Sequence, residues 1–344
     1  MSIPRLSKRL PICCALSLAL CCRSARAAQM EGPTVYSAWP AEAVIADDGG
    51  QAYCVDESVI LKLDLKKSTV TKINVDKAVT GKEFILAGFG PNGELIGYSK
   101  AGLWAFDPVE HATRVIFTAP PDEKIRYATV QPKSHTILIS LAPQNHPDDS
   151  TDETLSLAIH DLVKLTWSGN EVQQEHIRTR REVLPIGAVF DINGSLFFPM
   201  RDVYRCEMED NDLNGSRYLP ISTEVVYTAG GSPSSFGALS IAVSNKWIYV
   251  YVNRLGGSSP DGLIVRFRKD NGRVGDHEST YESAMALYSK TLASMEVVQG
   301  EFAGGHNMLC ASANGKHVLW WSGNWHLIDD DGKPRLLSLK DASR

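Results

Sequence analysis

The chain has 344 residues, with 35 Lys and Arg against 40 Asp and Glu and a formal net charge of −5. This length fits one domain or two. The acidic balance argues against nucleic acid as a partner, because phosphate binding begins with a basic patch.

The first 27 residues are predicted to be a signal peptide. They contain a basic start, a short apolar stretch from Leu10 to Cys22, and the small-residue ending Ala25-Arg26-Ala27. The apolar stretch is too short to span a bilayer stably. A lipoprotein is the disfavoured alternative, since Leu20 precedes Cys21 where a small residue is required. We expect export to the periplasm or beyond, cleavage before Ala28 and no membrane span afterwards.

Removal of this segment changes the charge and the cysteine content. The segment carries five basic residues and no acidic one, so residues 28–344 have a formal charge of about −10. Three cysteines remain, Cys54, Cys206 and Cys310, and an odd number does not make a disulfide framework. Buried free thiols are the expectation. A Cys54–Cys310 bridge is the alternative, because these residues fall in the first and last repeats.

A repeated pattern runs through the rest of the chain. Each copy has an apolar run, a turn that ends in Gly or in a small or polar residue, and a second apolar run. In three copies an Asp follows the turn glycine at the same distance of 14 residues. The six turn positions are Gly50, Gly93, Ser134, Gly194, Asn245 and Gly315, and the three Asp residues are Asp64, Asp107 and Asp329.

The repeats predict an all-β fold, a β-propeller of six four-stranded blades. The shortest intervals between turns match one blade of about 40 to 45 residues, and the longer intervals then contain insertions. Ser283 to Ser294 is the one stretch whose spacing suits a helix, and we interpret it as an insertion in the fifth blade. A degenerate seventh blade is the alternative. The repeats run nearly end to end, so residues 28–344 are predicted to form a single propeller domain.

One mouth of the central channel is the predicted ligand site. In a propeller, the residues that open the innermost strands, and those between the second and third strands, lie on the same face. Each charged residue there is by itself an ordinary solvated side chain, but several blades bring such residues to one concavity, the usual setting for a binding site. The predicted ligand-binding residues are Glu42, Glu83, Arg126, Asp202 and His306.

A second candidate site is the segment that begins at Asp210. Asp210, Asp212 and Asn214 match the first three oxygen ligands of a calcium loop, and Gly215 matches its sharp turn. The bidentate Glu that usually completes the site is replaced by Ile221. A hairpin turn in the fourth blade is the simpler interpretation, because Asp, Asn and Gly are favoured in turns.

These repeats resemble the six-bladed propeller superfamily that includes gluconolactonase-like, strictosidine-synthase-like, TolB-like and NHL-repeat proteins. The likeness is one of architecture and covers essentially all of residues 28–344. It implies, for gluconolactonase-like members, a divalent metal over the channel, and Glu42 and Asp202 resemble two of their metal ligands. Ile186 stands where the family has an Asn, so a hard cation would lose an oxygen ligand to an alkyl side chain.

The leading hypothesis is therefore a non-enzymatic module without a cofactor or catalytic residues, which binds a protein or a small molecule. The alternative is a lactonase-like hydrolase that uses calcium or another divalent cation at the channel mouth. A scaffold that binds peptides along its rim is a third class, since a propeller needs no chemistry to be useful.

Overall fold

The computed structural model of the chain forms two compact units, Met1–Val35 and Tyr36–Arg344, and all of the described residues lie in the second unit. The structure describes residues 43–56, 59–81, 83–132, 136–145, 161–168, 171–179, 187–200, 202–209, 212–219, 235–255, 261–269, 296–303, 308–321, 325–329 and 334–341.

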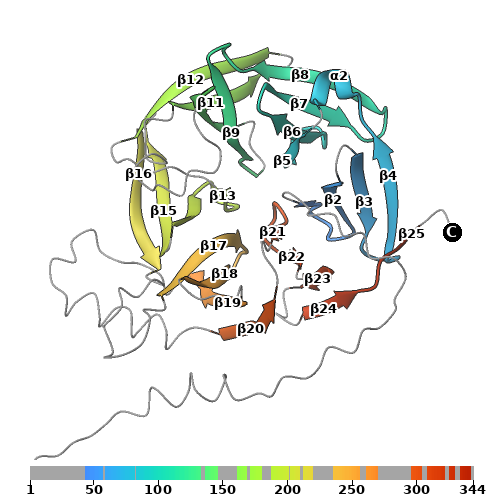
Figure 1. The fold of residues 1–344 in the computed structure, drawn as a ribbon, viewed down its shortest axis with the longest axis vertical. Helices are drawn as coiled ribbons and strands as arrows, with labels where there is room; N and C mark the ends of the chain where they lie inside the picture. Colours follow the sequence, from blue (N-terminus) through green and yellow to red (C-terminus); the bar gives the residue numbers. More distant parts are fainter. Residues whose placement is uncertain are drawn as a thin grey trace, which may run out of the picture. The chain divides into compact units, whose positions relative to one another are not determined.

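The second unit is a six-bladed β-propeller whose antiparallel blades follow one another around a central axis (Figure 1). Within each blade the strands pair in chain order from the inside outwards. The first three blades are β1 (Val44–Ile45), β2 (Gln51–Asp56), β3 (Val59–Asp64) and β4 (Thr69–Asn74); β5 (Ile85–Phe89), β6 (Leu95–Ser99), β7 (Gly102–Asp107) and β8 (Ala112–Thr118); and β9 (Glu123–Val130), β10 (Thr136–Pro143), β11 (Asp161–Ser168) and β12 (Glu171–Thr179).

The last three blades have the same order, and the third and fourth blades are joined at their outer strands by a short parallel pairing. A single helix, α2 (Lys77–Thr80), is found in the described part of the chain. The strands of these blades are β13 (Val189–Phe190), β14 (Leu196–Met200), β15 (Asp202–Glu209) and β16 (Asp212–Leu219); β17 (Ser235–Val243), β18 (Trp247–Leu255), β19 (Asp261–Arg268) and β20 (Glu296–Ala303); and β21 (Met308–Ala311), β22 (Val318–Trp321), β23 (Trp325–Ile328) and β24 (Pro334–Leu337).

Six apolar clusters hold neighbouring blades together, and each cluster takes its residues from two adjacent blades. The cluster between the first and last blades includes Leu63 and Leu319, which are 1% and 0% exposed. Successive strand residues point to opposite faces, so every blade can present one apolar face to each neighbour. Burial of each such side chain contributes about 1.5 to 3 kcal/mol, which makes the blade interfaces the main source of stability.

The repeated turn connects the first and second strands of each blade. In four blades its fourth residue is a glycine with positive φ, where a side chain is disfavoured: Gly49 (61°), Gly93 (84°), Gly194 (89°) and Gly315 (66°). Gly50, the position aligned from the sequence, comes one residue after the glycine with positive φ. The fifth blade closes a shorter turn instead, in which the Ser244 hydroxyl accepts a hydrogen bond from the N–H of Trp247 (3.0 Å).

The Asp residues of the repeat organise the turns around them. The carboxylate of Asp64 accepts the N–H groups of Lys66 and Lys67, and Asp107 accepts those of Val109 and Glu110. These are the local side-chain contacts that favour Asp in turns. Asp329 has a different partner, because its carboxylate lies 2.9 Å from Nδ1 of His317.

The ring closes between the first and last blades. The carboxylate of Asp47 accepts the N–H of Asn314 at 2.6 Å, and the carbonyl of Asp47 accepts the Asn314 side-chain amide at 2.5 Å. Beyond β24 the chain adds a short strand, β25 (Lys340–Asp341), parallel to β4 on the outer edge of the first blade. Polar contacts near the axis and a strand at the rim therefore both tie the two ends of the ring.

The predicted six-bladed, all-β fold is confirmed, and the described residues contain no seventh blade. The connection between β19 and β20 contains the expected insertion of the fifth blade, although Ser283 to Ser294 lies outside the described residues. Five of the six turn positions lie between the first and second strands of successive blades, and Ser134 is not described. Within the described ranges, no helix has the length and apolarity needed to cross a membrane.

We predict that Asn314→Ala lowers the free energy of unfolding by about 1 to 2 kcal/mol, because it removes the side-chain hydrogen bond to the Asp47 carbonyl and the two that Oδ1 accepts within its own turn. Asn92→Ala is the matched control. Asn92 occupies the same position of the second blade's turn, and its side chain contacts only Glu94 of that turn. Urea denaturation of both variants measures the difference, and an equal loss of stability would contradict this role for Asn314.

Candidate functional site

The inner strands of the six blades surround a cavity with a volume of about 940 Å³. All six inner strands contribute to its lining, and β5, β9 and β17 do so mainly through their C-terminal halves. The turns after β1, β5 and β21 line it as well, so the cavity extends to the end of the propeller where these turns lie. This volume is in the range of pockets that hold small molecules, roughly 300 to 1,000 Å³.

The lining is mostly apolar and combines small and β-branched side chains with aromatic ones such as Phe89 and Phe190. Among the described residues that line the cavity, Asp47 is the only one with a charged side chain. Hydroxyl groups are contributed by Tyr53, Thr129 and Ser312 among others. Representative apolar residues, one from each inner strand, are Ile45, Ala87, Val130, Val189, Val243 and Ala311.

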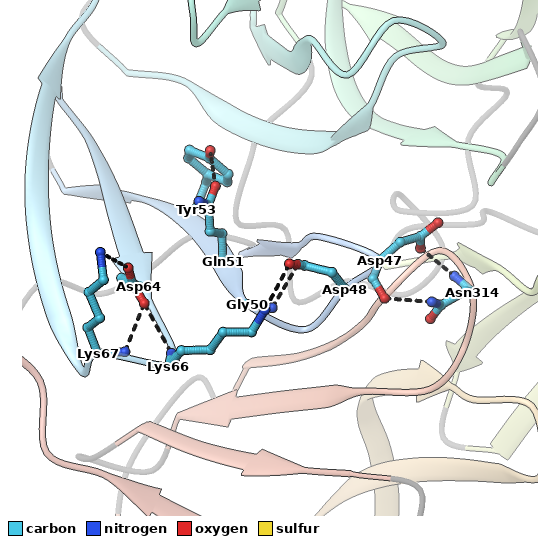
Figure 2. Close-up of polar contacts among 9 residues, drawn as sticks. All are labelled: Asp47, Asp48, Gly50, Gln51, Tyr53, Asp64, Lys66, Lys67 and Asn314. Atoms are coloured by element: carbon cyan, nitrogen blue, oxygen red, sulfur yellow. Dashed lines mark hydrogen bonds and ion pairs between the residues drawn. The ribbon is translucent and has the colours of Figure 1, made fainter.

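Asp47 lies in the turn after β1, and the ring closure fixes its carboxylate. One carboxylate oxygen accepts the N–H of Asn314, while Figure 2 shows no contact to the other oxygen among the residues drawn. No cation lies within ion-pair distance of Asp47 among the residues that the structure describes. The side chain is exposed, so its charge faces both solvent and the end of the cavity.

The neighbouring Asp48 is compensated. Its carboxylate accepts the N–H of Gly50 at 2.8 Å and lies 3.2 Å from Nζ of Lys66 (Figure 2). The hydrogen bond from the Gly50 N–H, and to a smaller extent the contact with Lys66, lower the pKa of Asp48. The two adjacent carboxylates thus differ: Asp48 pairs with Lys66 and does not line the cavity, whereas Asp47 lines its end and has no ion-pair partner among the described residues.

A tyrosine and a glutamine supply further polar groups at the wall of the cavity. The Tyr53 hydroxyl donates to Oε1 of Gln51 at 3.0 Å (Figure 2). Burial raises the pKa of Tyr53, so this hydroxyl stays protonated and acts as a donor. Gln51 accepts this contact through its side-chain oxygen and also lines the cavity.

The five residues predicted at the channel mouth are only partly described. Glu83 is exposed just before β5, and Arg126 is half-buried within β9; neither lines the cavity. Asp202 is the first residue of β15, and its side chain is not described. Glu42 and His306 lie outside the described residues. Their convergence on one site stays a prediction.

The metal-binding expectations also stay predictions. The simpler interpretation of the Asp210 segment agrees with the pairing of β15 and β16, in which Glu209 is opposite Asp212. Asp212 and Asn214 are strand residues whose side chains are not described, and Asp210 is outside the described residues. Within the described ranges, no group of three His, Cys, Asp or Glu side chains is placed to hold a metal ion.

The gluconolactonase-like ligand set also stays a prediction. Glu42 and Ile186 are outside the described residues, and the Asp202 side chain is not described, so only the sequence bears on this set. Two carboxylates and an alkyl side chain do not replace three oxygen donors for a hard cation. We therefore derive no reaction step through a metal.

Cys54 and Cys310 are free thiols in the first and last blades. Cys54 is 1% exposed within β2, and Cys310 is half-buried beside the cavity. Burial raises the pKa of both thiols, that of Cys310 to about 12. The expectation of free thiols is confirmed for these two residues, while the Cys206 side chain is not described.

Sequence reasoning missed the cavity lining. Residues such as Ala87, Val130 and Val243 line the cavity and also pack in or against the clusters between blades, so they look like core residues. The available signal was the topology: the innermost strand of a blade has no strand partner on its inner edge, so that edge faces the channel. Asp47 lies in the repeated turn, and no signal in the sequence marks it as a lining residue.

Solved structures similar to this chain are also propellers. A gluconolactonase from Xanthomonas campestris matches with a TM-score of 0.50 and 9% identity, over 82% of each chain. The calcium-binding protein regucalcin from Agrobacterium tumefaciens matches at 0.46 and 10%, over 82% of this chain and 81% of the other. A TolB-like protein of the same species matches at 0.43 and 13%, over 81% and 87%.

No family model matches the sequence, and no curated protein matches it. Identities this low show a shared fold and nothing finer. The architectural resemblance to six-bladed propellers is confirmed.

We predict that Cys54 and Cys310 react slowly in the folded protein, because the thiolate is the reactive species and burial disfavours it. In residues 28–344 carrying Cys206→Ser, iodoacetamide should label both thiols at least about a hundredfold more slowly without urea than with it. Mass spectrometry follows the labelling. Unfolded protein that resists labelling until a reductant is added would reveal a disulfide and contradict the free-thiol state.

Proposed function

We propose that this protein is a non-enzymatic binding protein that holds an apolar small molecule in its central channel. The observation that supports this most is the cavity of about 940 Å³, whose described lining is apolar apart from hydroxyl and amide groups and one carboxylate. Transfer of apolar surface from water into such a site is favourable at about 25 cal/mol per Å². Few polar groups then suffice to orient the ligand.

The lining supports binding in preference to catalysis. General acid and base catalysis needs titratable groups close to the reacting atoms. Around this cavity the described titratable groups are Asp47, the tyrosines and Cys310, and burial holds Cys310 in its neutral form. The lactonase alternative depends instead on Glu42 and Asp202 at the mouth, where Ile186 removes an oxygen ligand.

We further propose that the protein works outside the cytoplasm. The basic start, short apolar stretch and Ala-Arg-Ala ending of residues 1–27 support this. Expression in a Gram-negative host should give a periplasmic protein that begins at or near Ala28. Mass spectrometry that finds the intact leader on a soluble cytoplasmic protein would contradict export.

The channel proposal predicts that an uncharged naphthylamine dye, N-phenyl-1-naphthylamine, binds and becomes fluorescent. The double variant Ala87→Phe/Ala311→Phe fills the channel from two blades and should weaken binding at least about tenfold, or about 1.4 kcal/mol. Ala112→Phe is the control, because Ala112 is exposed on β8, away from the cavity.

Circular dichroism checks that the variants fold. Equal dye affinity in all three proteins would place the dye outside the channel and contradict the proposal. Lactone hydrolysis that depends on added metal and disappears in Glu42→Gln would support the enzyme instead.

A further inference from the structure

We propose that the ligand of the channel is an amphiphile with an apolar tail and a cationic head, and that Asp47 binds the head. This inference rests on the proposed function and adds the chemical class of the ligand. It is carried by the position of Asp47 at the end of an otherwise uncharged cavity.

The carboxylate of Asp47 is held in place before any ligand binds. Its backbone carbonyl and one carboxylate oxygen each accept a hydrogen bond from Asn314, at 2.5 and 2.6 Å (Figure 2). Asn314 is itself held, since its backbone carbonyl accepts from the Asn245 side chain at 2.8 Å. Three turns from three blades therefore position one carboxylate, and an ordered group loses less entropy when a ligand binds.

Asp47 has no ion-pair partner among the described residues, while three titratable neighbours are paired with other groups. Asp48 pairs with Lys66, and His317 of the adjacent turn lies against Asp329 at 2.9 Å. Glu94, in the next blade, pairs with Arg114 at 3.3 Å. Among the described residues that line the cavity, a ligand head therefore meets one charged side chain, that of Asp47.

This arrangement discriminates between head groups. A cationic head gains an attraction to Asp47, a neutral head gains none, and an anionic head is repelled. Asp47 is exposed, so the attraction is that of a surface ion pair, at most about 1 kcal/mol or about fivefold in affinity. Salt should screen it, because the Debye length is only about 3 Å at 1 M ionic strength.

Three amphiphiles with the same tail test the inference: decyltrimethylammonium, decanol and decyl sulfate, each below its critical micelle concentration. Displacement of the naphthylamine dye gives their affinities. We expect the ammonium compound to bind about fivefold more tightly than decanol, and decyl sulfate to bind more weakly than decanol. High salt should bring the three affinities together.

Asp47→Asn is the test variant, because an Asn side chain keeps an oxygen that can accept the N–H of Asn314 while it removes the charge. Asp48→Asn is the matched control: the residue is adjacent, but it is paired with Lys66 and does not line the cavity. The preference for the ammonium head should vanish in Asp47→Asn and persist in Asp48→Asn, while both variants still bind decanol.

Two different failures are distinguishable. Binding of decanol and the dye without any preference for the cationic head overturns the role of Asp47 but leaves an apolar channel ligand. Failure of all three amphiphiles and the dye to bind the wild-type protein overturns the proposed function as well. A cationic preference that survives Asp47→Asn but is lost in Glu42→Gln would place the head at the other mouth and overturn this inference.

Discussion

Closure of the ring between the first and last blades is the constraint on which the rest of this structure depends. Each blade presents apolar faces to two neighbours, so an open ring would leave the end faces of the first and last blades in water. At about 1.5 to 3 kcal/mol per buried side chain, apolar packing supplies most of the closing energy. The hydrogen bonds between Asp47 and Asn314 add about 1 kcal/mol each and fix how the two blades align.

Closure also creates the candidate site. The channel has six walls only because the ring is complete. The turns between the first and second strands of the blades lie at the end of that channel. Asp47 belongs to both features, since it pairs with the last blade and lines the cavity. A second cross-blade contact, the ion pair of buried Asp191 with Lys269 between the fourth and fifth blades, has no described place in the cavity and serves the ring alone.

The sequence was sufficient to predict the architecture because each blade repeats its own local chemistry. The positive-φ glycines and the Asp residues of the turns stabilise backbone only a few residues away. Their spacing is therefore visible as a repeat in the sequence. The pairing of Asp47 with Asn314 could not be predicted in this way, since the two residues are 267 positions apart and neither turn differs visibly from the others.

The cavity lining could not be predicted from the sequence for a different reason. Residues such as Ala87 and Val243 line the cavity and also pack in or against the clusters between the blades, so hydrophobic pattern alone does not separate a cavity wall from a core. The charged residues of the sequence predicted a site at one mouth of the channel, but Glu83 and Arg126 do not line the cavity. Only the ring geometry shows which apolar residues face the axis.

A crystal structure of the protein with decyltrimethylammonium bound is the most direct test of the account. We expect the decyl chain along the inner strands, against Ala87, Val130 and Val243, with the ammonium group beside the free carboxylate oxygen of Asp47. An empty channel, with the ligand bound elsewhere beside Glu83 or Arg126, would contradict it.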